Sequence, residues 1–183
     1  PIPAKSFLHE LLLLNHTVVM PESALEAGFI LLPREDMAVS ALGRFQPPPK
    51  RVLSHTLRIV DAATNESVCS CDTSTSSVPD LLGFVNCDAA ATLRRGREYF
   101  IVSAEGPGLG GYFAAQNPGW SVSSGYSSWM DYDRNMSTVV GSVARRGDGV
   151  WTKTAIADTM HVALNLHAVA ATAAPVRLKT TDD

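Results

Sequence analysis

Aromatic residues gather in one polar part of the chain, where their side chains are suited to contact with a ligand. Seven of the thirteen aromatic residues lie between Tyr112 and Trp151, several of them among Ser, Gly and Asn. Such rings can stack on the apolar face of a sugar, and Tyr and Trp also favour protein interfaces. An alternative is that some of these rings plug one end of the fold. The candidate ligand-binding residues are Tyr112, Trp120, Tyr126, Trp129 and Tyr132.

Two carboxylates alternate in the stretch 131–135, which begins like a calcium-binding loop. An EF-hand also needs glycine at the sixth position and a bidentate glutamate at the twelfth, whereas Met136 and Ser142 stand there. We therefore exclude an EF-hand. Asp131 and Asp133 remain candidates for a simpler calcium site, with an exposed polar loop as the alternative. A structural calcium ion is the one cofactor that the sequence leaves open.

The serines and histidines do not form a recognisable catalytic arrangement. No serine lies in a Gly-x-Ser-x-Gly motif. His55 lies in an alternating, strand-like stretch, where we expect a hydrogen-bonded structural histidine. His161 and His167 are about 20 Å apart along a strand, too far to share a metal ion. We predict no catalytic residue; the enzymatic alternative is a small hydrolase that uses Glu105 or Asp131 as its acid or base.

Three cysteines permit one disulfide. Cys69 and Cys71 are too close in sequence for a zinc knuckle, and in a strand they would share a face. A following antiparallel strand could bring Cys87 opposite either of them. We predict a disulfide that includes Cys87, with one thiol left over. Three reduced core cysteines are the alternative.

Asn-x-Ser/Thr occurs three times, which favours passage through the eukaryotic secretory route. The candidate acceptors for glycosylation are Asn15, Asn65 and Asn135. Together with a disulfide, they predict an extracellular or cell-surface protein. Because the chain begins at Pro1, we interpret it as a mature product or an excised fragment.

Length and composition predict a single folded domain. The 183 residues carry a formal charge of −3, and 45% are apolar and 18% charged. The low charge argues against disorder, and the weakly negative balance argues against nucleic acid as a partner. No stretch reaches the ~18 apolar residues of a membrane span. We expect one domain over 1–171, followed by a C-terminal tail over 172–183.

Short apolar or alternating runs separated by turn residues predict an all-β fold. The runs cover 28–32, 37–45, 52–60, 66–72, 81–87, 98–103, 138–143, 150–153 and 160–169. We expect an antiparallel, jelly-roll-like β-sandwich of nine or ten strands. Asn65 is suited to the left-handed conformation in the turn after the third run. In 37–45, alternation places Met37 and Val39 on one face and Leu42 and Arg44 on the other.

The middle of the chain resembles a widespread extracellular module. The resemblance rests on the strings Val39-Ser40-Ala41-Leu42-Gly43-Arg44-Phe45, His55-Thr56-Leu57-Arg58-Ile59-Val60-Asp61-Ala62, Gly83-Phe84-Val85 and Leu93-Arg94-Arg95-Gly96-Arg97-Glu98-Tyr99-Phe100-Ile101-Val102-Ser103-Ala104-Glu105, and it extends over roughly 28–169. The module is a β-sandwich appended to bacterial glycosidases and other secreted or surface proteins, and it is similar to carbohydrate-binding modules. The resemblance implies a jelly-roll-like accessory domain.

We therefore expect a non-catalytic extracellular module that contacts glycans or neighbouring protein domains. The alternative from another class is a structural subunit of an extracellular filament, appendage or shell, built by self-assembly. Exposed edge strands and the stiff loop Pro47-Pro48-Pro49 could serve such a lattice.

Overall fold

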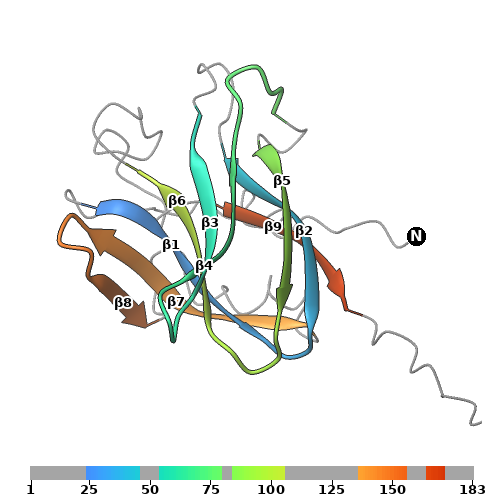
Figure 1. Ribbon diagram of the computed structural model, residues 1–183, viewed down its shortest axis with the longest axis vertical. Coiled ribbons are helices and arrows are strands. Elements are labelled where there is room, and N and C mark those ends of the chain that lie inside the picture. Colours follow the sequence, from blue (N-terminus) through green and yellow to red (C-terminus); the bar gives the residue numbers. More distant parts are fainter. Residues whose placement is uncertain (1–23, 46–53, 80–83, 106–135, 156–163, 172–183) are drawn as a thin grey trace, which may run out of the picture.

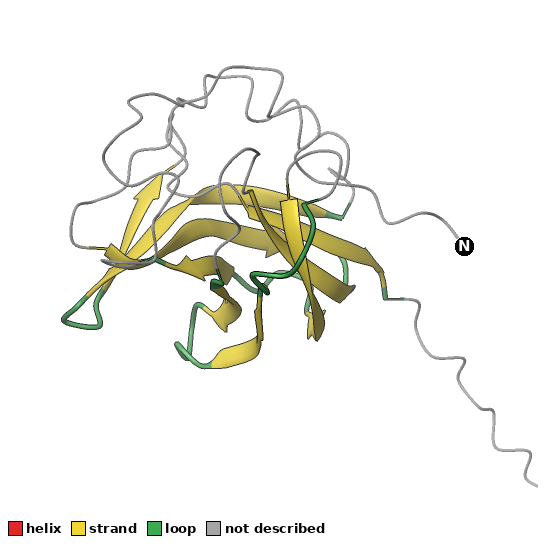
Figure 2. Cartoon of the chain, turned by 90° about the horizontal axis from the view of Figure 1, so that it is seen from above, coloured by secondary structure: helices red, strands yellow, loops and turns green. Residues whose placement is uncertain are grey.

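The computed structural model describes residues 24–45, 54–79, 84–105, 136–155 and 164–171. Every regular element in these ranges is a strand, as the colouring of Figure 2 shows. The strands are β1 (Ala24–Pro33), β2 (Met37–Phe45), β3 (Thr56–Asp61), β4 (Ser67–Asp72), β5 (Phe84–Leu93), β6 (Tyr99–Ala104), β7 (Ser137–Arg146), β8 (Trp151–Ala155) and β9 (Leu164–Ala170).

The strands form two antiparallel sheets of unequal size. The larger sheet has the order β4-β3-β6-β1-β7-β8, and the smaller has the order β5-β2-β9. In Figure 1 the smaller sheet lies on the right and β8 lies at the left. The chain changes sheet repeatedly, at β1–β2, β2–β3, β4–β5, β5–β6 and β8–β9. The predicted antiparallel β-sandwich is confirmed, with nine strands in the described ranges.

The main core lies between the two sheets. Alternate side chains of the larger sheet point into it, for example Phe29 and Ile101, each at most 1% exposed. Leu164 and Leu166 of β9 close it from the smaller sheet. Full burial of each such side chain contributes roughly 1.5–3 kcal/mol.

The larger sheet is also apolar on its outer face, the face turned away from the smaller sheet. A second cluster there consists of Ile30, Val60, Phe100, Val102 and Val143, each at most 4% exposed. These residues alternate along their strands with those of the main core. The central strands are therefore buried on both faces, which explains their continuous apolar runs.

A β-bulge in β2 changes the predicted orientation of Arg44. The register of β2 with both of its neighbours shifts between Val39 and Ala41. Met37 and Val39 are buried before this shift, and Leu42 and Arg44 are buried after it. The prediction that Arg44 lies on the face opposite Met37 is therefore wrong, because the irregularity interrupts the period of two.

Gly28 allows β1 to lie unusually close to β6. A Cβ atom at this position would lie 1.8 Å from the carbonyl oxygen of Ile101, so any other side chain would force the strands apart. Gly28 is paired with Val102 on one side and Val143 on the other. The centre of the larger sheet therefore depends on this glycine.

Candidate functional site

All five residues that the sequence predicts as ligand contacts lie outside the described residues: Tyr112, Trp120, Tyr126, Trp129 and Tyr132. The calcium candidates Asp131 and Asp133 and the glycosylation candidates Asn15 and Asn135 also lie outside them. Asn65 is described: it is exposed in the β3–β4 turn and has a φ of 60°. Its predicted left-handed conformation is confirmed.

Two neighbouring turns of the larger sheet enclose a surface depression of about 290 Å³. The β3–β4 turn contributes Asp61, Ala62 and Ala63, and the β5–β6 turn contributes Gly96, Arg97 and Glu98. The backbone N–H of Ala62 donates to the carbonyl of Glu98 at 3.0 Å, which joins the two turns. The depression thus lies where residues far apart in the sequence meet.

Asp61 organises the wall of the depression. One carboxylate oxygen accepts the backbone N–H of Ala63 at 2.9 Å, which closes the turn on itself. The other oxygen forms an ion pair with Arg97 at 2.8 Å. Asp61 is only 8% exposed, whereas half of the Arg97 side chain is exposed. The buried carboxylate therefore holds the Arg97 guanidinium in place at the surface.

Asp36, between β1 and β2, holds the second turn in place. Its carboxylate accepts the backbone N–H of Arg95 at 2.9 Å and the side chain of Arg94 at 2.7 Å. These two hydrogen bonds, that of Arg95 foremost, keep the pKa of Asp36 below its usual value. Gly96 adopts a φ of 74° and donates its N–H to the carbonyl of Pro33 at 2.9 Å. The β5–β6 turn is therefore fastened to the β1–β2 turn.

Aromatic rings and a lysine lie beside the depression on the outer face. Lys153 of β8 donates to Glu98 at 2.9 Å, and its ammonium lies 5.2 Å from the centre of the Phe100 ring. The half-buried Trp151 packs against Phe100 with ring centres 5.0 Å apart. Arg145 lies over the Trp151 ring at 5.3 Å. The depression therefore continues into a ring-and-cation surface.

A buried carboxylate occupies the opposite end of this face. Glu26 of β1 is 5% exposed and forms ion pairs with Arg58 of β3 and Arg145 of β7. Because two guanidinium groups meet one carboxylate, the cluster carries one net positive charge. Arg145 thereby links Glu26 to Trp151. The apolar cluster of the outer face therefore has charged side chains at both of its ends.

A second buried ion pair connects the two sheets. Arg44 of β2 donates through Nε and Nη2 to the two carboxylate oxygens of Glu105, both at 2.8 Å. The two side chains are 1% and 5% exposed. Glu105 directly follows β6, at the end opposite Glu98. Both oxygens of the carboxylate considered as a hydrolase acid or base are thus bound by Arg44.

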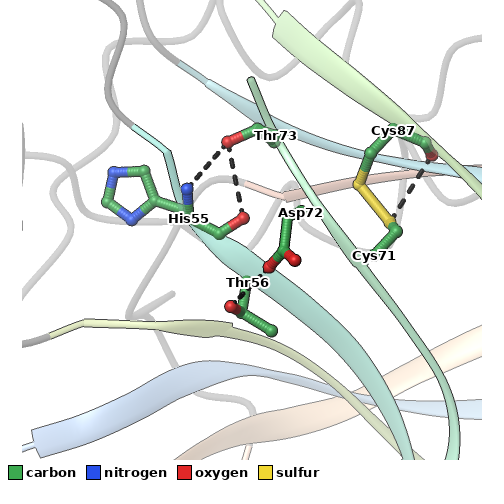
Figure 3. Close-up of a disulfide and its surroundings, with 6 residues drawn as sticks. All are labelled: His55, Thr56, Cys71, Asp72, Thr73 and Cys87. Carbon is green, nitrogen blue, oxygen red and sulfur yellow. Dashed lines mark hydrogen bonds between the residues drawn. A yellow bond between two sulfur atoms is a disulfide. The ribbon is translucent and has the colours of Figure 1, made fainter. Parts of the chain in front are cut away.

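The predicted disulfide is confirmed and joins Cys71 to Cys87. It connects β4, at the edge of the larger sheet, to β5, at the edge of the smaller one (Figure 3). The Cα atoms are 5.9 Å apart, within the usual range. Cys69 keeps a free, half-buried thiol, and burial raises its pKa.

The described ranges contain no group of three His, Cys, Asp or Glu side chains arranged to hold a metal ion. Among the same residues there is also no helix long and apolar enough to cross a membrane. No protein-family model matches the chain, and no curated protein matches it.

Proposed function

We propose that this protein is a non-catalytic extracellular binding module, and that Trp151 and the adjoining depression form a glycan-binding site. The observation that carries the proposal is the half-buried Trp151 ring, which packs on Phe100 near Lys153, and Lys153 in turn binds Glu98 in the wall of the depression. A ring of this kind can stack on the apolar face of a sugar. Glu98, Arg97 and Lys153 lie close enough to the depression to bond hydroxyl groups around it.

The rigidity of the two turns supports a preformed binding site. Asp61 is held by backbone N–H groups of its own turn, and Asp36 holds the neighbouring turn. Side chains mounted on such fixed backbones lose less conformational entropy when a ligand binds. A preformed site also suits sugars, which offer many weak hydrogen bonds and little apolar area.

An extracellular location is supported by two described features. Disulfides persist in oxidising compartments, and Cys71–Cys87 connects the edges of both sheets. The sequon at Asn65 lies on an exposed turn that an attached glycan can reach.

A neighbouring protein domain is the second ligand class that this face favours. Tryptophan and arginine dominate the energetics of protein interfaces, and Arg145 lies directly over Trp151. Because both ligand classes would use Trp151, the test has to offer them separately.

The proposal predicts that Trp151→Ala weakens glycan binding by about tenfold or more, because it removes the stacking surface; tenfold corresponds to about 1.4 kcal/mol. Arg97→Ala should also weaken binding, through lost hydrogen bonds. Binding of the purified full chain to a panel of glycans and polysaccharides, followed by calorimetry on the best ligand, measures both changes.

Thr152→Ala is the matched control. Thr152 lies on the same strand but its side chain points to the other face, so binding should stay unchanged. If Trp151→Ala folds poorly, Trp151→Phe takes its place. This variant keeps a ring and should retain part of the affinity. The glycan proposal is rejected if the wild-type chain binds nothing on the panel, or if folded Trp151→Ala binds like wild type. Capture of a co-secreted protein domain that depends on Trp151 would then identify the second ligand class.

A further inference from the structure

His55 is buried where the two sheets meet, and its backbone is held on both sides. The residue is 2% exposed and lies just before β3. Its N–H donates to the hydroxyl of Thr73 at 2.9 Å, and its carbonyl accepts the N–H of Thr73 at 2.9 Å. Figure 3 shows Thr73 bracketing this backbone. These bonds fix the backbone from which the buried imidazole projects.

The surroundings determine which ring nitrogen carries the proton. Nδ1 lies 3.2 Å from the carbonyl oxygen of Ala104, which can only accept a hydrogen bond. Nδ1 is therefore the protonated nitrogen of the neutral ring, and Nε2 carries a lone pair. Nε2 is buried and has no hydrogen-bond partner in the described part of the chain.

Two charged groups face the ring in that part of the chain: Arg44 from β2 and Glu105 from the end of β6. Glu105 lies 4.0 Å from Nδ1, beyond hydrogen-bond distance, and both of its oxygens are bound by Arg44. The pair is neutral as a unit. Protonation of His55 would therefore place an uncompensated charge, with an unpartnered Nε2–H, inside the fold.

We infer that His55 is an acid-sensitive latch between the sheets, which weakens the contact of β2 with β3 and β6 when the ring is protonated. Burial is the main reason that the pKa of His55 is below its usual value of 6.5, and the positive charge of Arg44 adds to the effect. Glu105 and the carbonyl of Ala104 oppose it only in part. The latch is distinct from the depression of the proposed glycan site, because the depression lies at the start of β6, whereas His55 contacts Ala104 at its end.

The sign of the effect follows from this lowered pKa. Below about pH 6.5 the unfolded chain binds the proton more readily than the folded chain, so acid favours unfolding. The contribution of neutral His55 is complete above 6.5. It is lost as the pH falls from 6.5 toward the folded-state pKa, below which the loss stops.

Urea unfolding of the full chain between pH 8 and pH 5 tests the latch. The unfolding constant of the wild type should rise by up to about tenfold per pH unit below 6.5. His55→Asn keeps an N–H for the carbonyl of Ala104 but does not titrate, so its rise should be clearly smaller. His167→Asn, in the half-buried β9 position, is the matched control and should keep the wild-type rise.

Two further measurements make the result decisive. Imidazole NMR of the wild type should show that His55 titrates below 6.5, and amide exchange should quicken at the ends of β2 and β6 on acidification. The latch is refuted if His55→Asn keeps the wild-type pH dependence, or if His55 titrates at or above 6.5. Should His55→Asn fail to fold, the imidazole titration of the wild type decides alone.

Discussion

Arg44 and Glu105 illustrate how much a buried charge depends on its partner. Removing one member of such a pair leaves the other unpaired in the interior and costs about 3–5 kcal/mol. Replacing both by apolar residues of similar size is often nearly neutral. Arg44 and Glu105 form a buried ion pair of this kind, because two hydrogen bonds of 2.8 Å join them and both side chains are at most 5% exposed.

We therefore predict that Glu105→Leu lowers the free energy of unfolding by about 3–5 kcal/mol, because Arg44 loses its bidentate partner. The double variant Arg44→Met, Glu105→Leu should recover most of this loss. Urea denaturation at pH 7.5, where His55 is neutral, measures both. If the double variant is less stable than Glu105→Leu, the pair is not the coupled unit that the structure indicates.

The sequence could not have placed this pair. Arg44 follows a regular alternation that assigns it to the face of Ser40, and only the bulge at Val39–Ala41 turns it inward. A bulge is defined by its pairing with neighbouring strands, here β5 and β9, and a single sequence does not show that pairing. His55 is different: its alternating stretch predicts a hydrogen-bonded histidine, and its Nδ1 lies 3.2 Å from the carbonyl oxygen of Ala104. Its burial is a finding of the structure.

At the scale of elements, the β1–β2 turn positions the site through one carboxylate. Asp36 binds both Arg94 and the backbone of Arg95, so the β5–β6 turn depends on its charge. The folded-state pKa of Asp36 is below its usual value of 3.8. Its contribution is therefore complete above about pH 3.8 and is lost as the pH falls through the lower, folded-state pKa.

Asp36→Asn should accordingly lower the melting temperature at neutral pH, and the difference from wild type should shrink below about pH 3.8 as Asp36 becomes protonated. Melting curves from pH 7 to pH 2 measure this difference. The exposed Asp148, whose carboxylate accepts the N–H of Val150, offers a matched control in another turn. A difference between Asp36→Asn and wild type that is constant across this range would show that the charge of Asp36 is unimportant.

Strand existence was predictable, and strand ends were less so. The apolar run over 37–45 coincides with β2. The start of alternation marks its first residue, and the prolines that follow mark its end. The run over 81–87 stops short of β5, which continues to Leu93. Its extension contains Ala89, Ala90 and Ala91, which have no apolar period, and pairing with β2 keeps it extended. Tertiary contacts thus decide what local propensity leaves open.

At the scale of the molecule, the two sheets are joined at separate places. The disulfide connects their edges at β4 and β5, and Arg44–Glu105 connects them at the end of β6. The candidate glycan site draws on the β3–β4 turn, the β5–β6 turn and β8. These segments are far apart in the sequence, and the aromatic clustering that indicated binding included only Trp151 among them. The rest of the site follows from sheet order, which composition does not reveal.

The disulfide should stabilise the whole sandwich without affecting the binding face. Cys71 and Cys87 are 16 residues apart, and closing a loop of about this size contributes roughly 3 kcal/mol in the chain-entropy model. Cys87→Ser should lower the free energy of unfolding by about that amount, because it leaves neither Cys69 nor Cys71 a cysteine partner on β5. Cys69→Ser, which leaves the disulfide intact, should change it little.

Urea denaturation with and without reductant measures these effects, and reduced wild type should resemble Cys87→Ser. Glycan affinity of the folded variant should match wild type, because Cys71 pairs with Leu57 near the start of β3, away from the β3–β4 turn that lines the depression. Equal stability of reduced and oxidised wild type would mean that the disulfide adds nothing to the core and the Arg44–Glu105 pair in holding the sheets together. A loss of affinity in folded Cys87→Ser would instead mean that the disulfide also positions the β3–β4 turn.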